Sequence, residues 1–444
     1  MATPKWLIFC VVLVLVNAWP WANKAAEGPL KVVDAPIDVG QPVLIQDLAA
    51  FETRCFKAKA PPKSTIFRAL ASVVALADSP ALSGGWQPAR PAMNSSEAGY
   101  ETLDQLVANP EKKSEFFFCL TTFSSQGCDS ILTVHLSCAE EPSPLVQLRP
   151  NFPLVWPHGD QAFILDAEVM EDIRVTALPV SGGKLNVTVF HQHSSTNCSG
   201  FSQHFPVTFG AAIVDLRTSD WFGEDFAQDF RKSLCIRVTS EGDVLLVAGP
   251  RIPGPFLVPA IPFVGRLDRM CESARIWVNN GTDVTVTVAA DDNSALMLSA
   301  MLSTDVQQAP SRWKGLVPPG GNGAALVIEG AKVYDAKLFD MASGHQEFSE
   351  SKQAARDVAV SLSICRRNPP QDAYTQDTRF WITSVTETGV VTLQDGIPAY
   401  ASVASGSQTW REFRLLIDGG KVTVAATAQG KVQLVADTKR FPRA

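Results

Sequence analysis

After its N-terminal segment, the sequence lacks any hydrophobic run long enough to cross a membrane as a helix. The most apolar later stretch, residues 244–264, is interrupted by Arg251 and five prolines, whereas a spanning helix needs about 20 mostly apolar residues. Long runs of basic residues are also missing, and Asp and Glu (45) outnumber Lys and Arg (38). These absences predict a mature chain without a membrane span and without a nucleic-acid partner.

The signatures of common enzyme classes are missing as well. The sequence has no Gly-x-Ser-x-Gly nucleophile elbow, and residues 344–348 read Gly-His-Gln-Glu-Phe, which is the wrong order for a His-Glu-x-x-His zinc helix. The glycines of residues 320–323 complete neither a phosphate-binding loop nor a dinucleotide-binding fingerprint. The sequence therefore predicts no catalytic residue, and it favours a binding role over an enzymatic one.

The first 22 residues are typical of a secretory signal peptide. Lys5 precedes an apolar run from Trp6 to Val16, and small residues follow at Ala18 and Ala22. We expect cleavage after one of these two alanines and a secreted, extracellular mature protein. Four Asn-x-Ser/Thr triplets fit passage through a eukaryotic secretory pathway. The predicted N-glycosylation sites are Asn94, Asn186, Asn197 and Asn280.

Removal of the signal peptide leaves eight cysteines, an even number that favours four disulfide bonds in an oxidising compartment. They are Cys55, Cys119, Cys128, Cys138, Cys198, Cys235, Cys271 and Cys365. If the first four pair among themselves, Cys365 must pair with Cys198, Cys235 or Cys271, and the other two must pair with each other. Within that choice we expect the bonds Cys235–Cys271 and Cys198–Cys365.

Alternation of apolar and polar residues predicts β-strands along most of the chain. In residues 271–301, two such alternations flank Asn279-Asn280-Gly281, which favours a tight turn. We expect a β-hairpin there, with Asn280 exposed at its tip. Similar strand-turn-strand patterns recur around Cys119 and Cys235, and their sequences show a weak internal similarity. A mainly β chain of several antiparallel β-sandwich domains is the predicted fold.

Pro- and Gly-rich stretches predict where the domains meet. We expect a β-rich domain at residues 27–145 and β-sandwich domains at 150–305 and 320–444, with residues 249–265 as a crossover inside the second. Residues 64–78 predict an amphipathic helix, because their apolar side chains recur every three or four residues. Residues 102–107 are a candidate for a second short helix near the N-terminus.

The densest group of metal-ligating residues is formed by His191, His193 and His204. On a continuous strand His191 and His193 share one face, which would place two imidazoles side by side, and His204 could add a third ligand for zinc or copper. The competing interpretation, which we favour, is a solvated polar loop without a metal. No other cofactor is suggested by the sequence.

The sequence as a whole favours a secreted, N-glycosylated, disulfide-bonded protein that works in binding, adhesion or extracellular structure. Its partner would be an extracellular protein or a carbohydrate, held by loops on rigid sheets. The alternative is a secreted metal-dependent enzyme or metal-binding protein that uses the three histidines. Zinc and copper analysis of the purified protein distinguishes these two hypotheses.

Overall fold

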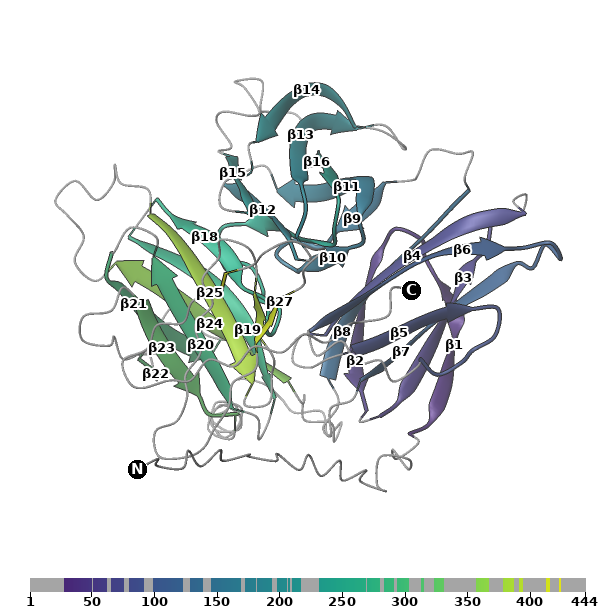
Figure 1. The fold of residues 1–444 in the computed structure, drawn as a ribbon, viewed down its shortest axis with the longest axis horizontal. Coiled ribbons are helices and arrows are strands. Elements are labelled where there is room, and N and C mark those ends of the chain that lie inside the picture. Colours follow the sequence, from purple (N-terminus) through teal and green to yellow (C-terminus); the bar gives the residue numbers. More distant parts are fainter. Residues whose placement is uncertain are drawn as a thin grey trace, which may run out of the picture.

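The fold consists of β-strands that form three sandwiches, which we call units 1, 2 and 3 (Figure 1). A computed structural model describes residues 28–49, 51–61, 65–75, 80–91, 99–122, 128–138, 145–168, 172–180, 182–193, 198–205, 207, 210–216, 231–268, 270–279, 283–290, 294–302, 313–314, 323–330, 357–366, 378–386, 391–393, 413–415 and 423–424. The named elements of these residues are all strands, which confirms the mainly β class. Within the same residues, no helix has the length and apolar character needed to cross a bilayer.

Unit 1 has two four-stranded sheets with the strand orders β1-β3-β7-β5 and β2-β8-β4-β6. Its strands are β1 (Leu30–Ile37), β2 (Pro42–Leu48), β3 (Thr53–Lys59), β4 (Ile66–Ala75), β5 (Pro80–Gly85), β6 (Tyr100–Ala108), β7 (Glu115–Thr122) and β8 (Cys128–Cys138). The facing sheets enclose an apolar core that includes Phe67, Phe116 and Phe118.

Unit 2 pairs a four-stranded sheet of order β10-β17-β12-β15 with a five-stranded sheet of order β14-β13-β16-β11-β9. Its strands are β9 (Val146–Leu148), β10 (Leu154–Trp156), β11 (Gly159–Glu168), β12 (Ile173–Pro179), β13 (Leu185–His193), β14 (Cys198–Phe205), β15 (Ala212–Leu216), β16 (Arg231–Ser240) and β17 (Val244–Pro250). Its core includes Trp156, Phe163 and Ile173.

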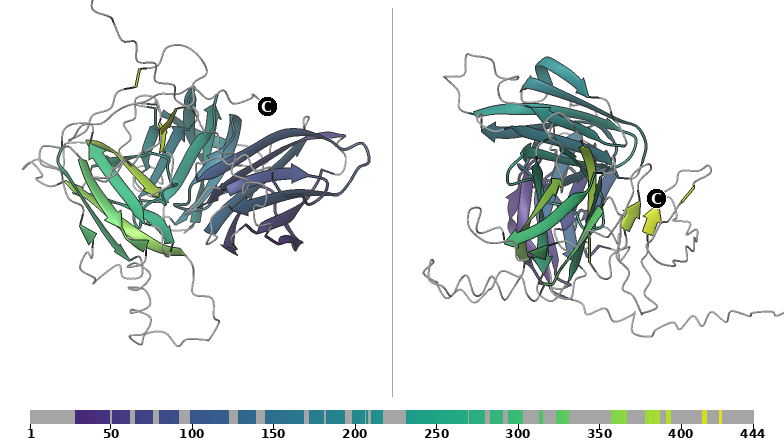
Figure 2. Two further views of the ribbon diagram at one scale, coloured as in Figure 1. Left: turned by 60° about the horizontal axis from the view of Figure 1, so that its bottom comes forward. Right: turned by 90° about the vertical axis from the view of Figure 1, so that its left-hand side faces the viewer.

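Unit 3 has two four-stranded sheets with the orders β18-β25-β20-β23 and β19-β24-β21-β22. Its strands are β18 (Phe263–Leu267), β19 (Cys271–Asn279), β20 (Val284–Ala290), β21 (Leu296–Leu302), β22 (Trp313–Lys314), β23 (Gly323–Ile328), β24 (Asp357–Arg366) and β25 (Thr378–Thr386). Two further short strands, β26 (Val391–Leu393) and β27 (Phe413–Leu415), pair with each other and lie outside the three sandwiches (Figure 2).

The three units share one strand order. When the strands of unit 3 are lettered B to I along the chain, one sheet reads B-I-D-G and the other C-H-E-F, which is the double-sheet arrangement of a jelly roll. Unit 2 has the same order, with β9 as an additional A strand beside C. Unit 1 also has an A strand, β1, and follows the order throughout except that its described residues include no F strand. We call the two sheets of each unit its BIDG and CHEF sheets.

The A strands are distinguished by their parallel pairing with strand C. β1 runs parallel to β3, and β9 runs parallel to β11. In unit 3 the A position is reduced to one parallel bridge between Phe256 and Arg275 of β19. The other strand pairings within the three units are antiparallel in the described residues.

The predicted hairpin at residues 271–301 is wrong. β19 belongs to the CHEF sheet and β20 to the BIDG sheet, so the chain crosses from one layer of the sandwich to the other between them. Alternation shows that each strand buries one face, and two strands that face each other across a core alternate just as two hydrogen-bonded neighbours do. The predicted exposure of Asn280 concerns a residue outside the described part of the chain.

The helices predicted near the N-terminus are also wrong. Residues 64–78 contain strand β4, and residues 102–107 lie within strand β6. One face of β4 points into the core of unit 1, while Leu70 and Val74 on its other face join the cores of units 2 and 3. A strand buried on both faces loses its alternation, and its remaining apolar pattern resembles a helical period.

The unit boundaries differ from the predicted domains after the first joint. The strands of unit 1 end at Cys138 and those of unit 2 begin at Val146, close to the predicted joint at residues 145–150. The predicted boundary at residues 305–320 instead falls inside unit 3, between strands of the same two sheets. Residues 251–262, predicted as part of an internal crossover, connect unit 2 to unit 3.

Among the described residues each unit has one disulfide bond, formed between strands of its CHEF sheet. The bonds are Cys55–Cys119, Cys198–Cys235 and Cys271–Cys365. The prediction that Cys365 pairs with one of three cysteines while the other two pair together is confirmed. The specific bonds Cys235–Cys271 and Cys198–Cys365 are wrong, because Cys271 and Cys365 lie directly opposite each other on β19 and β24.

A fourth disulfide within unit 1 is not formed as predicted. Cys128 and Cys138 occupy the two ends of the single strand β8, and at about 3.4 Å per residue such ends lie roughly 30 Å apart. A disulfide needs Cα atoms within about 7 Å. Cys138 is a free, half-buried cysteine, and the side chain of Cys128 is outside the described residues.

Consecutive units contact each other in the same way twice. Strand B of unit 2, β10, packs against strands D and G of unit 1, β4 and β6. Strand B of unit 3, β18, packs against strands D and G of unit 2, β12 and β15. In units 1 and 2 the outer face of the BIDG sheet therefore receives the following unit, and we call these contacts junction 1–2 and junction 2–3.

Candidate functional site

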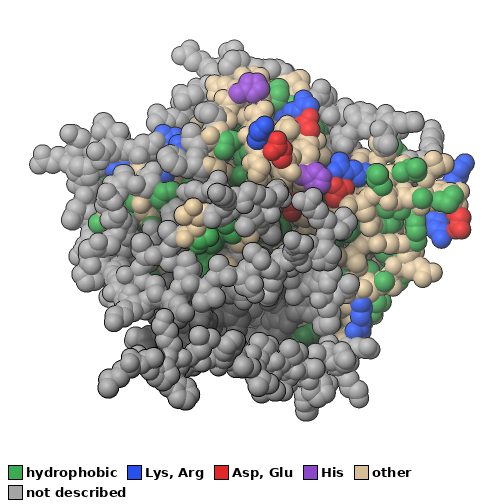
Figure 3. All heavy atoms as spheres, viewed as in Figure 1, with side chains coloured by type: hydrophobic (Ala, Val, Ile, Leu, Met, Phe, Trp, Pro, Cys, Tyr) green, Lys and Arg blue, Asp and Glu red, His purple; other side chains and the backbone are tan. Residues whose placement is uncertain are grey.

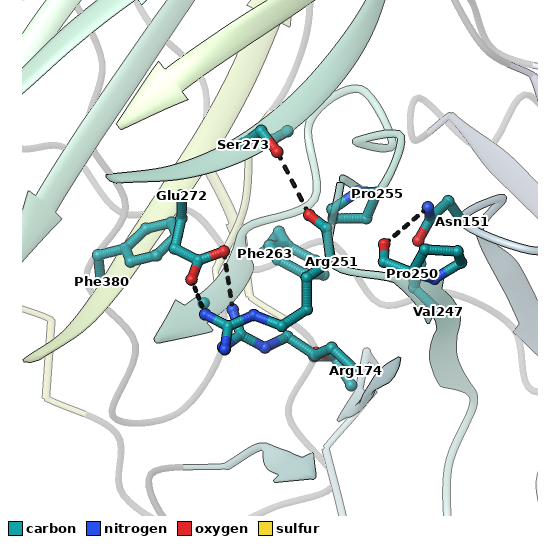
Figure 4. A pocket seen from close by; sticks show the side chains of 13 residues that line it. Asn151, Arg174, Val247, Pro250, Arg251, Pro255, Phe263, Glu272, Ser273 and Phe380 are labelled. Carbon is teal, nitrogen blue, oxygen red and sulfur yellow. Dashed lines mark hydrogen bonds and ion pairs between the residues drawn. The ribbon is translucent and has the colours of Figure 1, made fainter. Parts of the chain in front are cut away.

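Junction 2–3 contains a cluster of charged side chains that the three-dimensional fold brings together from separate strands. Arg174 lies on β12 of unit 2, Arg251 lies in the connection between the units, and Glu272 lies near the start of β19 in unit 3. Both guanidinium groups are directed at the Glu272 carboxylate (Figure 4). The Nη1 atom of Arg174 is 3.3 Å from Oε2 of Glu272, and Arg251 hydrogen-bonds the other carboxylate oxygen.

Three further charged residues complete the cluster. Arg251 also donates from Nη1 to Oδ2 of Asp268 at 2.8 Å. Arg174 donates from Nε to Asp215 of β15 at 2.6 Å, and Arg266 of β18 lies 3.7 Å from the same carboxylate. Three positive and three negative side chains thus balance one another across the junction.

The cluster is largely removed from solvent. The side chains of Arg174, Arg251 and Glu272 are only 10, 7 and 6% exposed. Burial raises the pKa of Glu272, and the two arginines oppose that rise. Burial also favours a higher pKa for Asp268, but the hydrogen bond and the charge of Arg251 outweigh it and lower this pKa to about 2. Arg251 therefore holds Asp268 as a carboxylate at all ordinary pH values.

A small pocket lies beside the cluster and is lined by residues of both units, among them Asn151, Phe263 and Phe380 (Figure 4). Its volume of about 20 Å³ has room for about one water molecule. Ser273, which also lines the pocket, donates from Oγ to the carbonyl oxygen of Arg251 at 3.3 Å. The cluster holds each charge in an ion pair, and the pocket has no space for an organic substrate. This arrangement is suited to holding units 2 and 3 together.

The connection between units 2 and 3 is fitted closely to its surroundings. Gly254 has φ +86°, and a Cβ atom at this position would lie 2.2 Å from the carbonyl oxygen of Ser273. Phe256 stacks on Trp277 with ring centroids 5.3 Å apart, and the guanidinium group of Arg275 lies 3.9 Å from the Phe256 centroid. These contacts fix the path of the connection, and with it the position of Arg251.

Sequence reasoning missed this cluster. Its members are spread over residues 174–272 and have no characteristic spacing. One signal was present, because Arg251 is the sole charged residue in the apolar stretch 244–264. A lone charge in such a segment is expected to find a buried partner.

The three histidines of the predicted metal site lie on neighbouring strands of unit 2. His191 and His193 belong to β13 and His204 to β14, but His204 pairs with Thr188 instead of with either histidine. Its Nδ1 is 2.7 Å from the Thr188 hydroxyl. The side chains of His191 and His193 are outside the described residues. Within the described part of the chain no group of three metal-ligating residues occurs, and the zinc or copper site stays a prediction.

One predicted glycosylation site can be placed. Asn186 lies on β13 and is exposed, as an acceptor must be. Asn94, Asn197 and Asn280 belong to segments outside the described residues. N-glycosylation therefore stays a prediction, with Asn186 as its accessible candidate.

Comparisons with known proteins leave the chain without an assigned family. No protein family matches it, and no curated protein matches it. A structural search finds similarity to a solved structure reported as "The Triple Jelly Roll Fold and Turret Assembly in an Archaeal Virus", with 8% identity, a TM-score of 0.15, and coverage of 77% of this chain and 82% of that chain. A likeness this low supports no inference, and the jelly-roll assignment rests on the strand orders alone.

Proposed function

We propose that this protein is a secreted, N-glycosylated extracellular binding or structural protein that acts by presenting surfaces on a rigid array of jelly-roll units. The observation that carries the proposal is the repeated junction, in which the BIDG sheet of one unit is covered by the next. Rigid scaffolds that hold surface groups in fixed positions are suited to recognition. One disulfide in each unit fits an oxidising compartment.

The outer CHEF face of unit 2 is our candidate binding surface. Arg237 donates from Nε to Asp160 at 2.8 Å, and Gln147 donates to Asp166 at 2.8 Å. Acidic and basic side chains lie side by side over this part of the molecule (Figure 3). A face of ordered hydrogen-bonding groups suits a polar partner such as a carbohydrate or a polar protein surface.

The test uses the full chain expressed through its own N-terminus in a secretory host. We expect binding to one or more members of a panel of extracellular glycans and proteins, and we expect Arg237→Ala to weaken it about tenfold or more, as loss of a charged hydrogen bond would. Arg68→Ala is the matched control, because Arg68 makes the same two-pronged pair with Asp104 on unit 1. Equal binding by both variants would exclude this face as the binding surface.

A further inference from the structure

The two short strands that follow unit 3 repeat a feature found at the start of each unit. β26 and β27 run parallel, as only the A and C strands do elsewhere in the described residues. Their separation along the chain is also similar. Leu30 pairs with Thr53, Val146 with Phe163, Phe256 with Arg275 and Val391 with Phe413, so the partner lies 23, 17, 19 and 22 residues further on.

The position of β26 matches that of an A strand as well. In unit 2 strand A begins at Val146, eight residues after the last residue of unit 1's strand I, Cys138. The bridge of Phe256 comes six residues after Pro250, which ends strand I of unit 2. β26 begins at Val391, five residues after Thr386, which ends strand I of unit 3.

On the outer face of unit 3's BIDG sheet, side chains of the two central strands are buried, as they are beneath the junctions of units 1 and 2. On β20 and β25, Val286 and Ile382 point into the core, so Thr287, Trp381 and Thr383 point outward. These three outward side chains are only 5, 6 and 2% exposed. On the corresponding strands of unit 2, Thr176 and Val247 are 2 and 4% exposed beneath unit 3.

We infer that β26 and β27 are the A and C strands of a fourth jelly-roll unit, and that the segment after Thr386 docks on the outer BIDG face of unit 3 through Thr287, Trp381 and Thr383. The occupant is this chain's own segment, because the same contact joins each earlier pair of units. None of the three receiving side chains is charged, so the occupant contacts them with uncharged groups. Leu393 of β26 is half-buried and is the candidate contact.

The experiment combines hydroxyl-radical footprinting of Trp381 with limited trypsin digestion of the folded full chain. In the wild type we expect slow oxidation of Trp381 and slow cleavage at Arg411 and Lys421. Leu393→Asp changes the proposed occupant, and Thr287→Arg changes the receiving face. Both should raise Trp381 oxidation and tail cleavage by about tenfold, since cleavage follows the population of the open form.

Val327→Arg is the matched control, because Val327 shares the outer face on the edge strand β23 but is 49% exposed. It should behave as the wild type. Trypsin cleavage inside β19 to β25 would show that Thr287→Arg unfolds unit 3. In that case Leu393→Asp alone tests the inference, since it leaves the sheet of unit 3 unchanged. Equal Trp381 oxidation in Leu393→Asp and the wild type overturns the inference. Protection that depends on protein concentration also overturns it, because a second copy would then cover the face.

Discussion

Junctions 1–2 and 2–3 use the same strands for contact and different chemistry to hold it. Junction 1–2 buries apolar and aromatic contacts, with Leu70 of unit 1 in the core of unit 2 and His135 edge-on to Trp156, while its contact between His158 and Asp104 at 3.8 Å is partly exposed. Its Thr102 hydroxyl also donates to Asp243 at 2.9 Å. Junction 2–3 instead buries the balanced cluster around Arg251 and Glu272. The contact geometry thus follows from the jelly-roll topology, while the side chains that fill it are free to differ.

This difference has consequences for how each junction responds to change. When a side chain at an apolar contact is truncated, the free energy of unfolding falls with the apolar area lost and with the volume of the cavity that is left. A buried ion pair is sensitive to the loss of one partner, because the other charge is left buried and unpaired. Substitutions and changes of pH should therefore affect the stability of the two junctions differently.

The largest effect is expected for Arg251→Ala. The substitution leaves the carboxylates of Glu272 and Asp268 without their shared partner, one of them 6% exposed. We expect a loss of about 4 kcal/mol in the free energy of unfolding, measured by urea denaturation. Arg251→Lys, which keeps the charge, should lose less. A loss below about 1 kcal/mol for Arg251→Ala would mean that the cluster does not lock the junction.

Leu70→Ala tests the apolar junction and should have the next largest effect. Leu70 is 5% exposed although it lies on the outer face of its sheet. Truncating a buried leucine leaves a cavity, and we expect a loss of about 3 kcal/mol in the same urea experiment. Leu106→Ala is the control, because Leu106 is on the outer face of the neighbouring strand and is 74% exposed. Equal losses in the two variants would contradict the packing of unit 2 on Leu70.

Acid should weaken junction 1–2 through His135. Burial lowers the pKa of this imidazole to about 4, with a smaller contribution from the charge of Arg68. In the unfolded chain a histidine has a pKa of about 6.5. The folded state therefore favours the neutral form, so its contribution to stability is complete above pH 6.5 and declines as the pH falls to about 4. The loss should reach about 2 kcal/mol at pH 5.

The measurement for His135 is the difference in unfolding free energy between the wild type and His135→Leu from pH 7.5 to 4. Burial raises the pKa of Glu101 to about 7 and also raises that of Asp243, so these carboxyls change stability in the opposite direction as the pH falls. Their contributions cancel in the difference. A difference that stays constant over this range would show that His135 is not held neutral in the folded state.

The smallest effect is expected for Arg237→Ala on the outer face of unit 2. Arg237 and Asp160 are 49 and 44% exposed, so water already screens their attraction. We expect a loss of about 0.5 kcal/mol that becomes smaller still in 1 M salt. A loss similar to that of Arg251→Ala would remove the contrast between surface and junction ion pairs.

The sequence by itself determined the β class, the repeated strand pattern and part of the cysteine pairing. Alternation of apolar and polar residues indicates that a strand buries one face. Counting the cysteines restricted the partner of Cys365 to three residues. Neither signal states which strand lies beside which, because hydrogen-bonded neighbours and strands that face each other across a core give the same alternation. The predicted hairpin at residues 271–301 and the bond Cys235–Cys271 were wrong for this reason.

Tertiary structure alone decided the strand order, the joint between units 2 and 3, and the cluster at junction 2–3. β4 was predicted as a helix because later units cover its outer face, so that both of its faces are apolar. No local sequence pattern can predict that contact. Arg174, Arg251 and Glu272 are separated by up to 98 positions in the chain. They meet because the BIDG sheet of unit 2 receives unit 3, and buried charges take the partners that the packing places within reach.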